Sequence, residues 1–392
     1  MKKIMLSLIA IPIFLGATYL LLPPLNVEKF FGPTASIDDS ANTLAAPYAL
    51  RNLFVADMHA DTLLWKRSLA ERSDRGHADL HRLMDVNVGL QIFMSVVEAP
   101  DDVDSDAIQQ EGDQITTVAL LDKWPYQTLG SYKERALYHA SKLFGAAESS
   151  NGKLKVLLSK EDLVAGRQNW QTKDGPLLAI LGMEGAHATE FKVENVEELF
   201  DFGFRSMGLA HYSDTEFAGS SSGMTKHGLT DRGKVLIKKM NAIGMIVDVA
   251  HLSNQGIEDV LNMTEKPVYS SHTGVYATCS KARNLPDTII KKIAQSQGLI
   301  GIGFFEGAIC GNALEDIVGA IKHVRDLVGS EYVGLGSGWD VASLAITPTE
   351  LPDLTQALLD QGLSEKEVRD VMGRNIARFF LENLPSKEYK SI

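Results

Sequence analysis

Residues 244–251 read GMIVDVAH, a short apolar run that ends in a histidine. Seven further apolar runs lie along the chain, at 53–61, 88–97, 177–185, 204–211, 267–273, 298–304 and 333–340. Most are apolar throughout, as strands buried on both faces of a sheet should be. Stretches of helical period separate most of them, clearly so at 193–202 and 231–242. Alternating strands and helices imply a parallel sheet, and eight such units predict an α/β fold of the (β/α)8 TIM-type barrel class.

The second and third predicted strands are too far apart for a single crossover. Helical stretches are expected between them, around 108–124 and 132–149. We interpret residues 98–176 as a helical insertion after the second strand, which covers the mouth of the active site at the top of the barrel.

The N-terminal part of the chain has a different character. Lys2 and Lys3 precede an uncharged, mostly apolar run at 4–22, which is just long enough to span a bilayer as a helix. We expect residues 1–22 to be an N-terminal apolar helix that serves as a membrane anchor, with a cleaved signal segment as the alternative. Residues 23–50 are predicted to be a linker and residues 51–386 the barrel domain. The barrel is then membrane-anchored or exported, on the extracytoplasmic (periplasmic) side.

Composition excludes some partners and chemistries. The formal net charge is −12 and no basic patch with interleaved aromatic residues is present, so a nucleic-acid partner is not expected. The two cysteines, Cys279 and Cys310, are too few for a disulfide framework or a Cys-type zinc site. We expect two buried free thiols, with one disulfide as the alternative if the chain is exported.

Metal-capable side chains finish several of the predicted strands, and the C-terminal ends of barrel strands meet on one face. His59 and Asp61 are two residues apart, so on a strand both point the same way and can bind one ion together. His251 and His272 end successive strands and would converge on a second ion. Glu184 lies between the first pair and the second pair in barrel order and can bridge both ions. Imidazole and carboxylate without thiolate predict two Zn²⁺ ions, with Mn²⁺ or Co²⁺ possible.

The motifs at these strand ends are DMHAD at 57–61, GMEGAH at 182–187, LAH at 209–211, DVAHLS at 248–253, SHT at 271–273 and ARNLPD at 282–287. Together, from about 53 to 383, they resemble the membrane (renal) dipeptidase family, two-zinc peptidases of the amidohydrolase-type barrels. The resemblance implies that His59, Asp61, Glu184, His251 and His272 are the metal ligands. It also implies that His211 and Arg283 contact a dipeptide or similar small amide, and it suggests a homodimer.

The end of the eighth strand departs from the family pattern. The family has a Gly-Ser-Asp-Phe-Asp-Gly type of sequence there, whose first Asp is the catalytic, substrate-contacting acid, whereas residues 336–341 read GSGWDV. Gly338 therefore replaces that acid, and Asp340 matches only the second one. Because alternate residues of a regular strand face the same side, we expect Asp340 to substitute for the missing acid.

The predicted function is that of a zinc-dependent dipeptidase, in which a metal-bridging hydroxide attacks the amide carbonyl. His211 would stabilise the oxyanion, Arg283 would bind the C-terminal carboxylate, and Asp340 would pass a proton to the leaving nitrogen. Two alternatives stay open. One is hydrolysis of another amide or ester, such as an N-acyl amino acid or a lactam. The other, motivated by Gly338, is a catalytically silent barrel that binds a peptide or metal.

Overall fold

The computed structural model describes residues 23–32, 53–101, 103, 107–170, 175–340 and 343–387. The predicted anchor or signal segment at 1–22 lies outside these residues. Within them, none of the helices combines the length and the apolar character that a membrane span requires.

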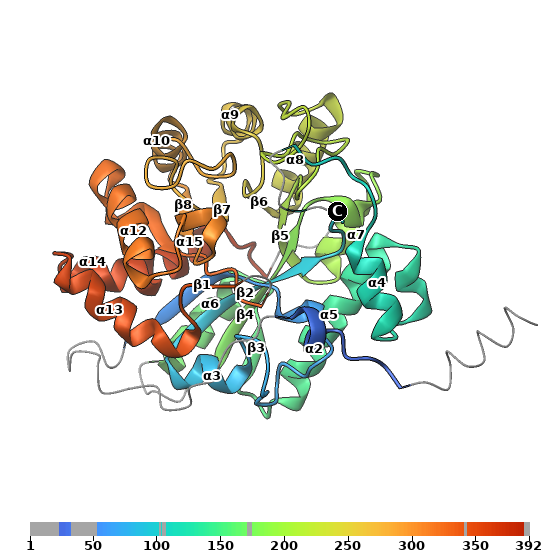
Figure 1. Cartoon of the computed structure of the whole chain (residues 1–392), viewed down its shortest axis with the longest axis horizontal. Coiled ribbons are helices and arrows are strands. Elements are labelled where there is room, and N and C mark those ends of the chain that lie inside the picture. The colour runs from blue at the N-terminus through green and yellow to red at the C-terminus, as the bar shows by residue number, and fades with distance from the viewer. Residues whose placement is uncertain are drawn as a thin grey trace, which may run out of the picture.

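Eight parallel strands close into a barrel surrounded by helices (Figure 1). They are β1 Val55–Ala60, β2 Val88–Val96, β4 Leu177–Glu184, β5 Phe204–Gly208, β6 Ile246–Asp248, β7 Tyr269–Thr273, β8 Leu299–Ile302 and β9 Val333–Leu335. The barrel closes because β1 pairs with both β2 and β9, while β2 also pairs with β4 over seven residues. The predicted TIM-type barrel is confirmed, and each strand begins within one of the eight predicted runs.

One further strand was not predicted. β3, Leu154–Val156, pairs with the first residues of β4, on the edge that pairs with β5 further along. Only Leu154 of its three residues is buried, so β3 lacks the continuous apolar run that marks the barrel strands. It belongs to the segment between β2 and β4, which also holds α4 Gln114–Leu121, α5 Tyr132–Ser149 and α6 Lys160–Asn169.

The other helices follow the strands around the barrel. They are α3 Leu80–Asp85, α7 Asn195–Asp201, α8 Asp231–Ile243, α9 Asn254–Met263, α10 Asp287–Gln295, α11 Glu306–Ile309, α12 Leu314–Val328, α13 Leu351–Asp360, α14 Glu365–Arg369 and α15 Asn375–Asn383. Short 3₁₀ turns lie at Thr62–Leu64, Tyr126–Leu129, His187–Thr189, Ser330–Tyr332 and Pro348–Glu350, and a π-helical turn at Asp370–Arg374.

Helix α8 illustrates how the sequence determines where a helix begins, which face it buries and where it ends. The Thr230 side chain accepts a hydrogen bond from Gly233 N and so caps the first turn. The helix buries Leu236, Ile237 and Met240, which lie on one face at helical spacing. It ends at Gly244, which has φ +82°, a conformation that glycine adopts without steric penalty. β6 begins two residues later.

Part of the predicted linker is folded against the barrel. Residues 28–31 form α2 (Glu28–Phe31), and Leu25 N donates to Leu121 O at 3.1 Å. Val27 is buried, and its backbone N–H donates to Asp122 Oδ1 at 2.7 Å. Residues 25–28 therefore contact the end of α4 and the residue that follows it. The composition of the predicted linker did not indicate these contacts. The rest of the predicted linker, 33–50, lies outside the described residues.

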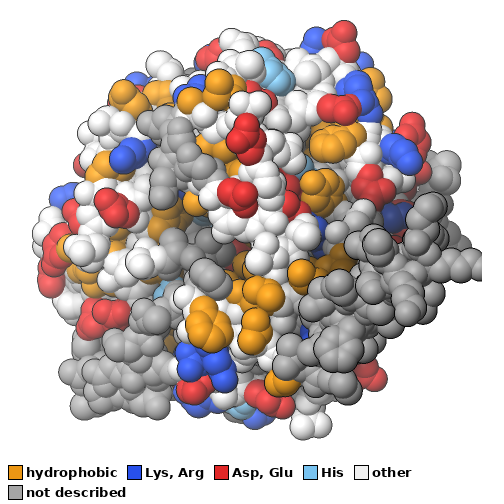
Figure 2. All heavy atoms as spheres, turned by 45° about the vertical axis from the view of Figure 1, so that its right-hand side comes forward, with side chains coloured by type: hydrophobic (Ala, Val, Ile, Leu, Met, Phe, Trp, Pro, Cys, Tyr) orange, Lys and Arg blue, Asp and Glu red, His pale blue; other side chains and the backbone are white. Residues whose placement is uncertain are grey.

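The surface carries charges of both signs. Figure 2 shows one face of the molecule, on which acidic and basic side chains are interspersed with apolar ones. Scattered apolar side chains are normal on a soluble surface.

Candidate metal centre

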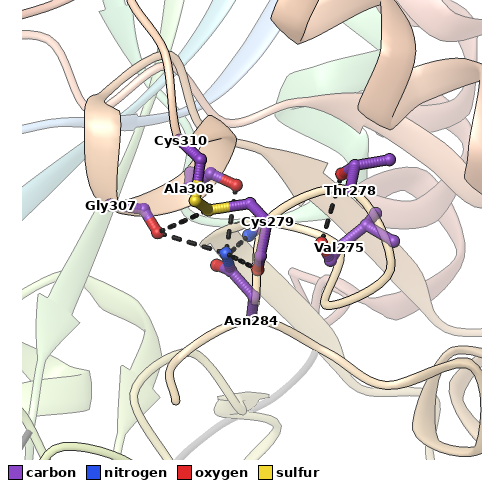
Figure 3. Close-up of a disulfide and its surroundings, with 8 residues drawn as sticks. Val275, Thr278, Cys279, Asn284, Gly307, Ala308 and Cys310 are labelled. Atoms are coloured by element: carbon purple, nitrogen blue, oxygen red, sulfur yellow. Dashed lines mark hydrogen bonds between the residues drawn. A yellow bond between two sulfur atoms is a disulfide. The ribbon is translucent and has the colours of Figure 1, made fainter. Parts of the chain in front are cut away.

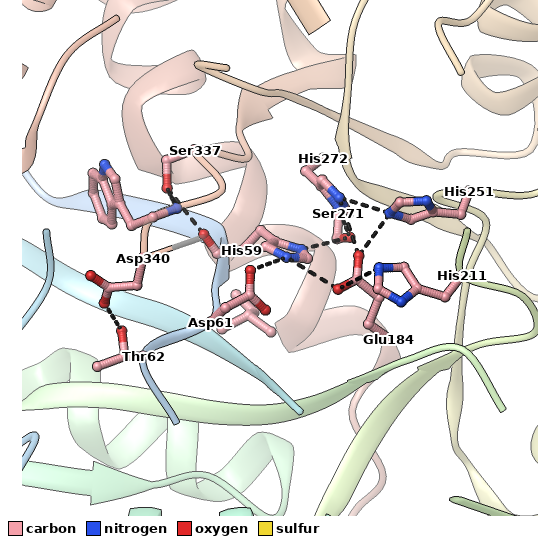
Figure 4. Close-up of polar contacts among 12 residues, drawn as sticks. His59, Asp61, Thr62, Glu184, His211, His251, Ser271, His272, Ser337 and Asp340 are labelled. Atoms are coloured by element: carbon pink, nitrogen blue, oxygen red, sulfur yellow. Dashed lines mark hydrogen bonds and ion pairs between the residues drawn. The ribbon is translucent and has the colours of Figure 1, made fainter. Parts of the chain in front are cut away.

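Imidazoles from four strand ends surround the carboxylate of Glu184 (Figure 4). Glu184 Oε1 lies 2.8 Å from His251 Nε2 and 3.2 Å from His272 Nε2. Its Oε2 lies 3.4 Å from His211 Nε2 and 3.9 Å from His59 Nε2. All five side chains are buried. The barrel thus brings together residues that are up to 213 positions apart, from His59 to His272.

Two overlapping groups of side chains could each hold a metal ion. His59, Glu184 and His272 form one group, and Glu184, His211 and His251 form the other, with the ligand atoms of each group within 4.8 Å of one another. This grouping differs from the predicted pairing of His251 with His272, and it adds His211.

The donor set fits bound cations. His251 Nε2 and His272 Nε2 lie 3.0 Å apart and face the same carboxylate. Asp61 Oδ2 lies 3.1 Å from His59 Nε2, while its Oδ1 is buried without a hydrogen-bond partner. A buried, unpartnered carboxylate oxygen is costly, and a cation beside it would remove that cost. Buried imidazoles and carboxylates without thiolate are the ligands that zinc uses in catalytic sites.

Neighbouring groups fix the orientation of the imidazole rings. The Ser271 hydroxyl lies 3.2 Å from His59 Nδ1 and 3.0 Å from His272 Nδ1, so that Nε2 of each ring faces Glu184. His211 Nδ1 donates to the backbone carbonyl of Glu98 at 3.0 Å. A carbonyl can only accept, so Nδ1 of His211 carries the proton and Nε2 of the neutral ring is an acceptor. Such outer partners commonly orient metal ligands.

Burial governs the protonation of these rings. It lowers the pKa of His211 to about 3, and it also lowers the pKa values of His251 and His272. Neutral imidazole is the form that binds metal ions. Burial lowers the pKa of His59 as well, but the charges of Asp61 and Glu184 outweigh it and raise that pKa to about 9. A cation at this position would therefore compete with a proton.

Two buried carboxylates, those of Asp57 and Asp248, accept hydrogen bonds from residues at the strand ends. Neither role was predicted from the sequence. Asp57 accepts hydrogen bonds from Ser337 N at 2.8 Å and from Gln91 Nε2 at 2.7 Å. Asp248 Oδ1 accepts from Ser271 N at 3.0 Å and from Ala250 N. They join strand ends whose ligands must meet at one point. The signal was available, because each carboxylate precedes a histidine in the motifs DMH and DVAH.

A cavity of about 400 Å³ opens onto the metal centre. Its lining includes His59, Asp61, Glu184, His211, His272, Arg283, Phe305 and Gly338. Arg283 is half-buried, and its guanidinium carbon lies 4.4 Å from the ring centre of Phe305. Its Nη2 donates to His272 O at 3.3 Å, while Nε has no partner. The guanidinium of Arg283 therefore lies in the cavity beside the predicted ligands.

Asp340 does not line this cavity. Its carboxylate accepts hydrogen bonds from Thr62 Oγ1, Arg67 Nη2 and the backbone N–H of His77, each at 2.5 Å. In Figure 4 the side chain points to Thr62, away from Glu184. The prediction assumed a regular strand through 340, but β9 ends at Leu335. Gly338 has φ +76° and Asp340 has φ +79°, so the alternation of a strand does not apply there. This geometry counts against the role of proton shuttle predicted for Asp340.

The two cysteines form a disulfide, so the expectation of two free thiols is wrong (Figure 3). Cys279 follows β7 and Cys310 follows β8, and the fold places their Cα atoms 5.2 Å apart. Asn284 Nδ2 donates to the carbonyls of Cys279, at 2.8 Å, and Gly307, at 3.1 Å. The segment that carries Arg283 is thereby joined to α11. Linear spacing could not show that these two loops are neighbours.

A parallel barrel whose strand ends present buried imidazoles around one carboxylate defines the class of metal-dependent barrel hydrolases. Within that class the chain belongs to the family described as membrane dipeptidase, peptidase family M19, whose pattern residues 42–389 match.

Related proteins agree with this assignment. Dipeptidase aclJ of Aspergillus oryzae is 33% identical over 221 residues, which are 54% of this chain and 52% of that protein. The match thus spans about half the length of that relative. Dipeptidase tcpJ of Claviceps purpurea is 26% identical over 321 residues, or 78% of this chain and 69% of that protein.

A solved structure shares the fold. It is a metallopeptidase from Rhodobacter sphaeroides liganded with a phosphinate mimic of the dipeptide L-Ala-D-Ala, with a TM-score of 0.69 at 23% identity. The similarity covers 85% of this chain and 99% of that chain.

Proposed function

We propose that this protein is a dipeptidase that uses two divalent metal ions, most simply zinc. The observation that carries the proposal is the convergence of His59, His251, His272 and His211 on Glu184, beneath a cavity that also contains Arg283. The family and the dipeptidase relatives support the same reaction. A dipeptide mimic bound to the Rhodobacter metallopeptidase supports the substrate class.

The residues proposed to hold the metals are His59, Asp61, Glu184, His251 and His272. Glu184 is the bridging candidate, because each of its oxygens faces a different set of imidazoles. When bound, two such ions lower the pKa of a shared water and polarise the amide carbonyl. This supplies a nucleophile near neutral pH.

His211 is proposed to bind the developing oxyanion. With its proton on Nδ1, the neutral ring offers only an acceptor at Nε2. The low pKa of His211 keeps the ring neutral until negative charge develops beside it. The proton that makes Nε2 a donor would come from the attacking water, whose O–H bond breaks as its oxygen bonds to the carbonyl carbon. Such an interaction is stronger in the transition state than in the ground state, which is what accelerates a reaction.

Arg283 is proposed to bind the carboxylate of the substrate. Its guanidinium keeps a buried, unpartnered Nε and is held in place by Phe305 and by the carbonyl of His272. A planar guanidinium recognises a carboxylate through two parallel hydrogen bonds. Because one end of the substrate is fixed in this way, the amide to be cleaved is held at a defined distance from the metal centre.

The direct test is metal content together with turnover. Full-length protein in detergent is loaded with Zn²⁺, and bound metal is measured by mass spectrometry alongside hydrolysis of a dipeptide panel. We expect two ions per chain, and chelation should abolish hydrolysis while added Zn²⁺ restores it. Two bound ions without turnover of any dipeptide would instead support the silent barrel.

The location of the barrel is a separate part of the proposal. We propose that residues 1–22 anchor or export the chain and that a barrel domain at 51–386 works on the extracytoplasmic side. The Cys279–Cys310 disulfide supports this, because disulfides persist in oxidising compartments. Cell fractionation with N-terminal sequencing tests it. A homodimer also remains a proposal, and sedimentation velocity is its test.

A further inference from the structure

We infer that the preferred substrates are N-acyl amino acids whose acyl group is apolar and carries no free amine. This inference rests on the proposed function and concerns the end of the substrate that lies opposite Arg283. It follows from the lining of the cavity, which supplies a cation for a carboxylate but an apolar wall for the other end.

The apolar wall is a continuous buried cluster. Leu64, Trp65, Val96 and Ile115 all line the cavity, and they belong to one hydrophobic cluster. None of the four is more than 7% exposed. Val118 and Ala99, which also line the cavity, pack against the same cluster. An acyl chain in contact with this wall would lose water from apolar surface on both sides, which favours binding.

Trp65 presents only its hydrocarbon surface to a ligand. Its indole N–H donates to the backbone carbonyl of Asp340 at 2.6 Å, so the single polar group of the ring is already used. The side chain of Asp340 is likewise occupied by Thr62, Arg67 and the backbone of His77. No donor or acceptor from these two residues is left for a polar ligand group.

With Asp61 and Glu184 bound to the proposed metal ions, an ammonium group would find no buried carboxylate left among the described residues that line the cavity. Among the described residues that line the cavity, the carboxylates are Asp61, Glu184 and Asp101. The first two are buried against the imidazoles of the metal centre. Asp101 is exposed at the rim, where solvent weakens an ion pair. A charge taken out of water without a partner is strongly disfavoured.

Gly338 contributes no side chain on the remaining side. A Cβ there would lie 3.0 Å from Phe305 Cδ1, so the Phe305 ring occupies the space next to it. The same ring stacks on Arg283. This part of the cavity therefore presents an aromatic ring and a guanidinium, and neither is a carboxylate that could pair with an ammonium group.

The test compares two substrates that differ by one amino group. Leu-Gly and 4-methylpentanoyl-glycine share the same chain, amide and carboxylate, and kcat/KM is measured for both with the zinc-loaded full-length protein. We expect the desamino compound to react at least tenfold faster. The ratio of the two rates should fall as the pH rises from 7 to 9, because the amine of Leu-Gly, with an ordinary pKa of about 8, loses its proton.

The outcomes separate this inference from the proposed function. Hydrolysis of Leu-Gly at an equal or higher kcat/KM overturns the inference and leaves the dipeptidase proposal standing. Hydrolysis of neither compound, nor of any dipeptide, overturns both. Hydrolysis of the desamino compound at the higher rate supports both.

Variants of the wall give a second test. Val118 is half-buried, so Val118→Asp places a carboxylate at the edge of the wall without burying a charge in the hydrophobic core. Val118→Asn is the neutral control. We expect only the Asp variant to improve Leu-Gly relative to 4-methylpentanoyl-glycine, by about tenfold. Asp101→Asn should change both substrates by less than threefold. A selective loss of Leu-Gly hydrolysis in that variant would show that the rim binds the amine, which would overturn the inference.

Discussion

Arg67 Nη2 lies 2.5 Å from Asp340 Oδ2, and both side chains of this ion pair are buried. Arg67 Nε also donates to Glu28 Oε1 at 2.8 Å. Asp340 therefore connects the end of β9 to the turn after β1 and, through Arg67, to α2. The charge of Arg67 holds the pKa of Asp340 below its usual value, against the effect of burial. The carboxylate therefore stays ionised at neutral pH.

Replacing Asp340 by Asn should therefore destabilise the fold more than it slows the reaction. Breaking a buried pair by removing one charge costs about 3 to 5 kcal/mol, and we expect the lower end because Glu28 still faces Arg67. In the folded fraction, kcat should change by less than about threefold, against the 10²-fold or greater loss typical of a general acid. Urea denaturation and active-site titration measure the two effects. A kcat that falls 100-fold at unchanged stability would restore the catalytic role.

The barrel was predictable because its strands are buried on both faces. Such strands give continuous apolar runs, and β4, with eight buried residues, is the clearest of them. The proposed ligands were found because they sit where those runs end. β3 was missed because its single buried residue gives no such signal. Continuous apolar runs thus identify the barrel strands and the positions just after them.

The position of Asp340 shows where this reasoning stops. The predicted run continued to 340, whereas extended pairing stops at Leu335 and the backbone turns at Gly338. His251 has φ +65° for the same reason, since it lies three residues after β6 ends at Asp248. Beyond the last ladder bond, the direction of a side chain depends on tertiary hydrogen bonds. The pattern of apolar residues in a single sequence does not predict those hydrogen bonds.

Substitution of the proposed ligands should change metal content in a graded way. His251→Ala should lose about one ion per chain, and Glu184→Ala should weaken binding of both, because Glu184 faces both groups of imidazoles. Hydrolysis should disappear in each variant. His323→Ala is the control, because His323 pairs with Asp287 on the surface and belongs to neither group. Glu184→Ala protein that retains two ions at unchanged affinity would contradict the bridging role.

Glu98 should make the protein less stable as the pH rises. Burial, with Asp113 nearby, raises the pKa of Glu98 to about 8, despite the opposite effect of Arg135. Below that value the folded state holds a proton that the unfolded state has lost, so stability falls with increasing pH up to about 8, by at most about 1.4 kcal/mol per pH unit.

The measurement for Glu98 is the free energy of unfolding of wild type and Glu98→Gln between pH 6.5 and 8.5. The window avoids His187, which lies 3.5 Å from Glu98 and whose pKa burial lowers to about 4. A ring with a lowered pKa affects stability only below the ordinary histidine value of about 6.5. The decline should be shallower in the variant. Parallel curves for the two proteins would show that Glu98 does not titrate here.

Loss of the Cys279–Cys310 disulfide should reduce both stability and substrate affinity. The two cysteines are 31 residues apart, and closing a loop of that length stabilises a fold by about 3 to 4 kcal/mol in the chain-entropy model. The loop contains Arg283 and Phe305, so its loosening should raise KM more than it lowers kcat. The Cys279→Ala/Cys310→Ala protein should show both effects and no response to reductant. If complete reduction of the disulfide left the KM of the wild-type protein unchanged, the disulfide would have no effect on substrate binding.

Arg283 should determine the requirement for a substrate carboxylate, and a coupling measurement can isolate that role. Arg283→Met removes the charge but keeps an apolar chain over Phe305, so the packing seen in the structure is largely retained. We expect kcat/KM for a carboxylate substrate to fall about 10²-fold, the effect of losing roughly 2 to 3 kcal/mol from a buried charge-assisted pair. Amidation of the substrate should cause a similar loss in wild type. In the variant, amidation should change the rate by less than threefold, because the carboxylate no longer has a partner. Equal penalties for amidation in both proteins would mean that Arg283 affects the reaction only through the fold.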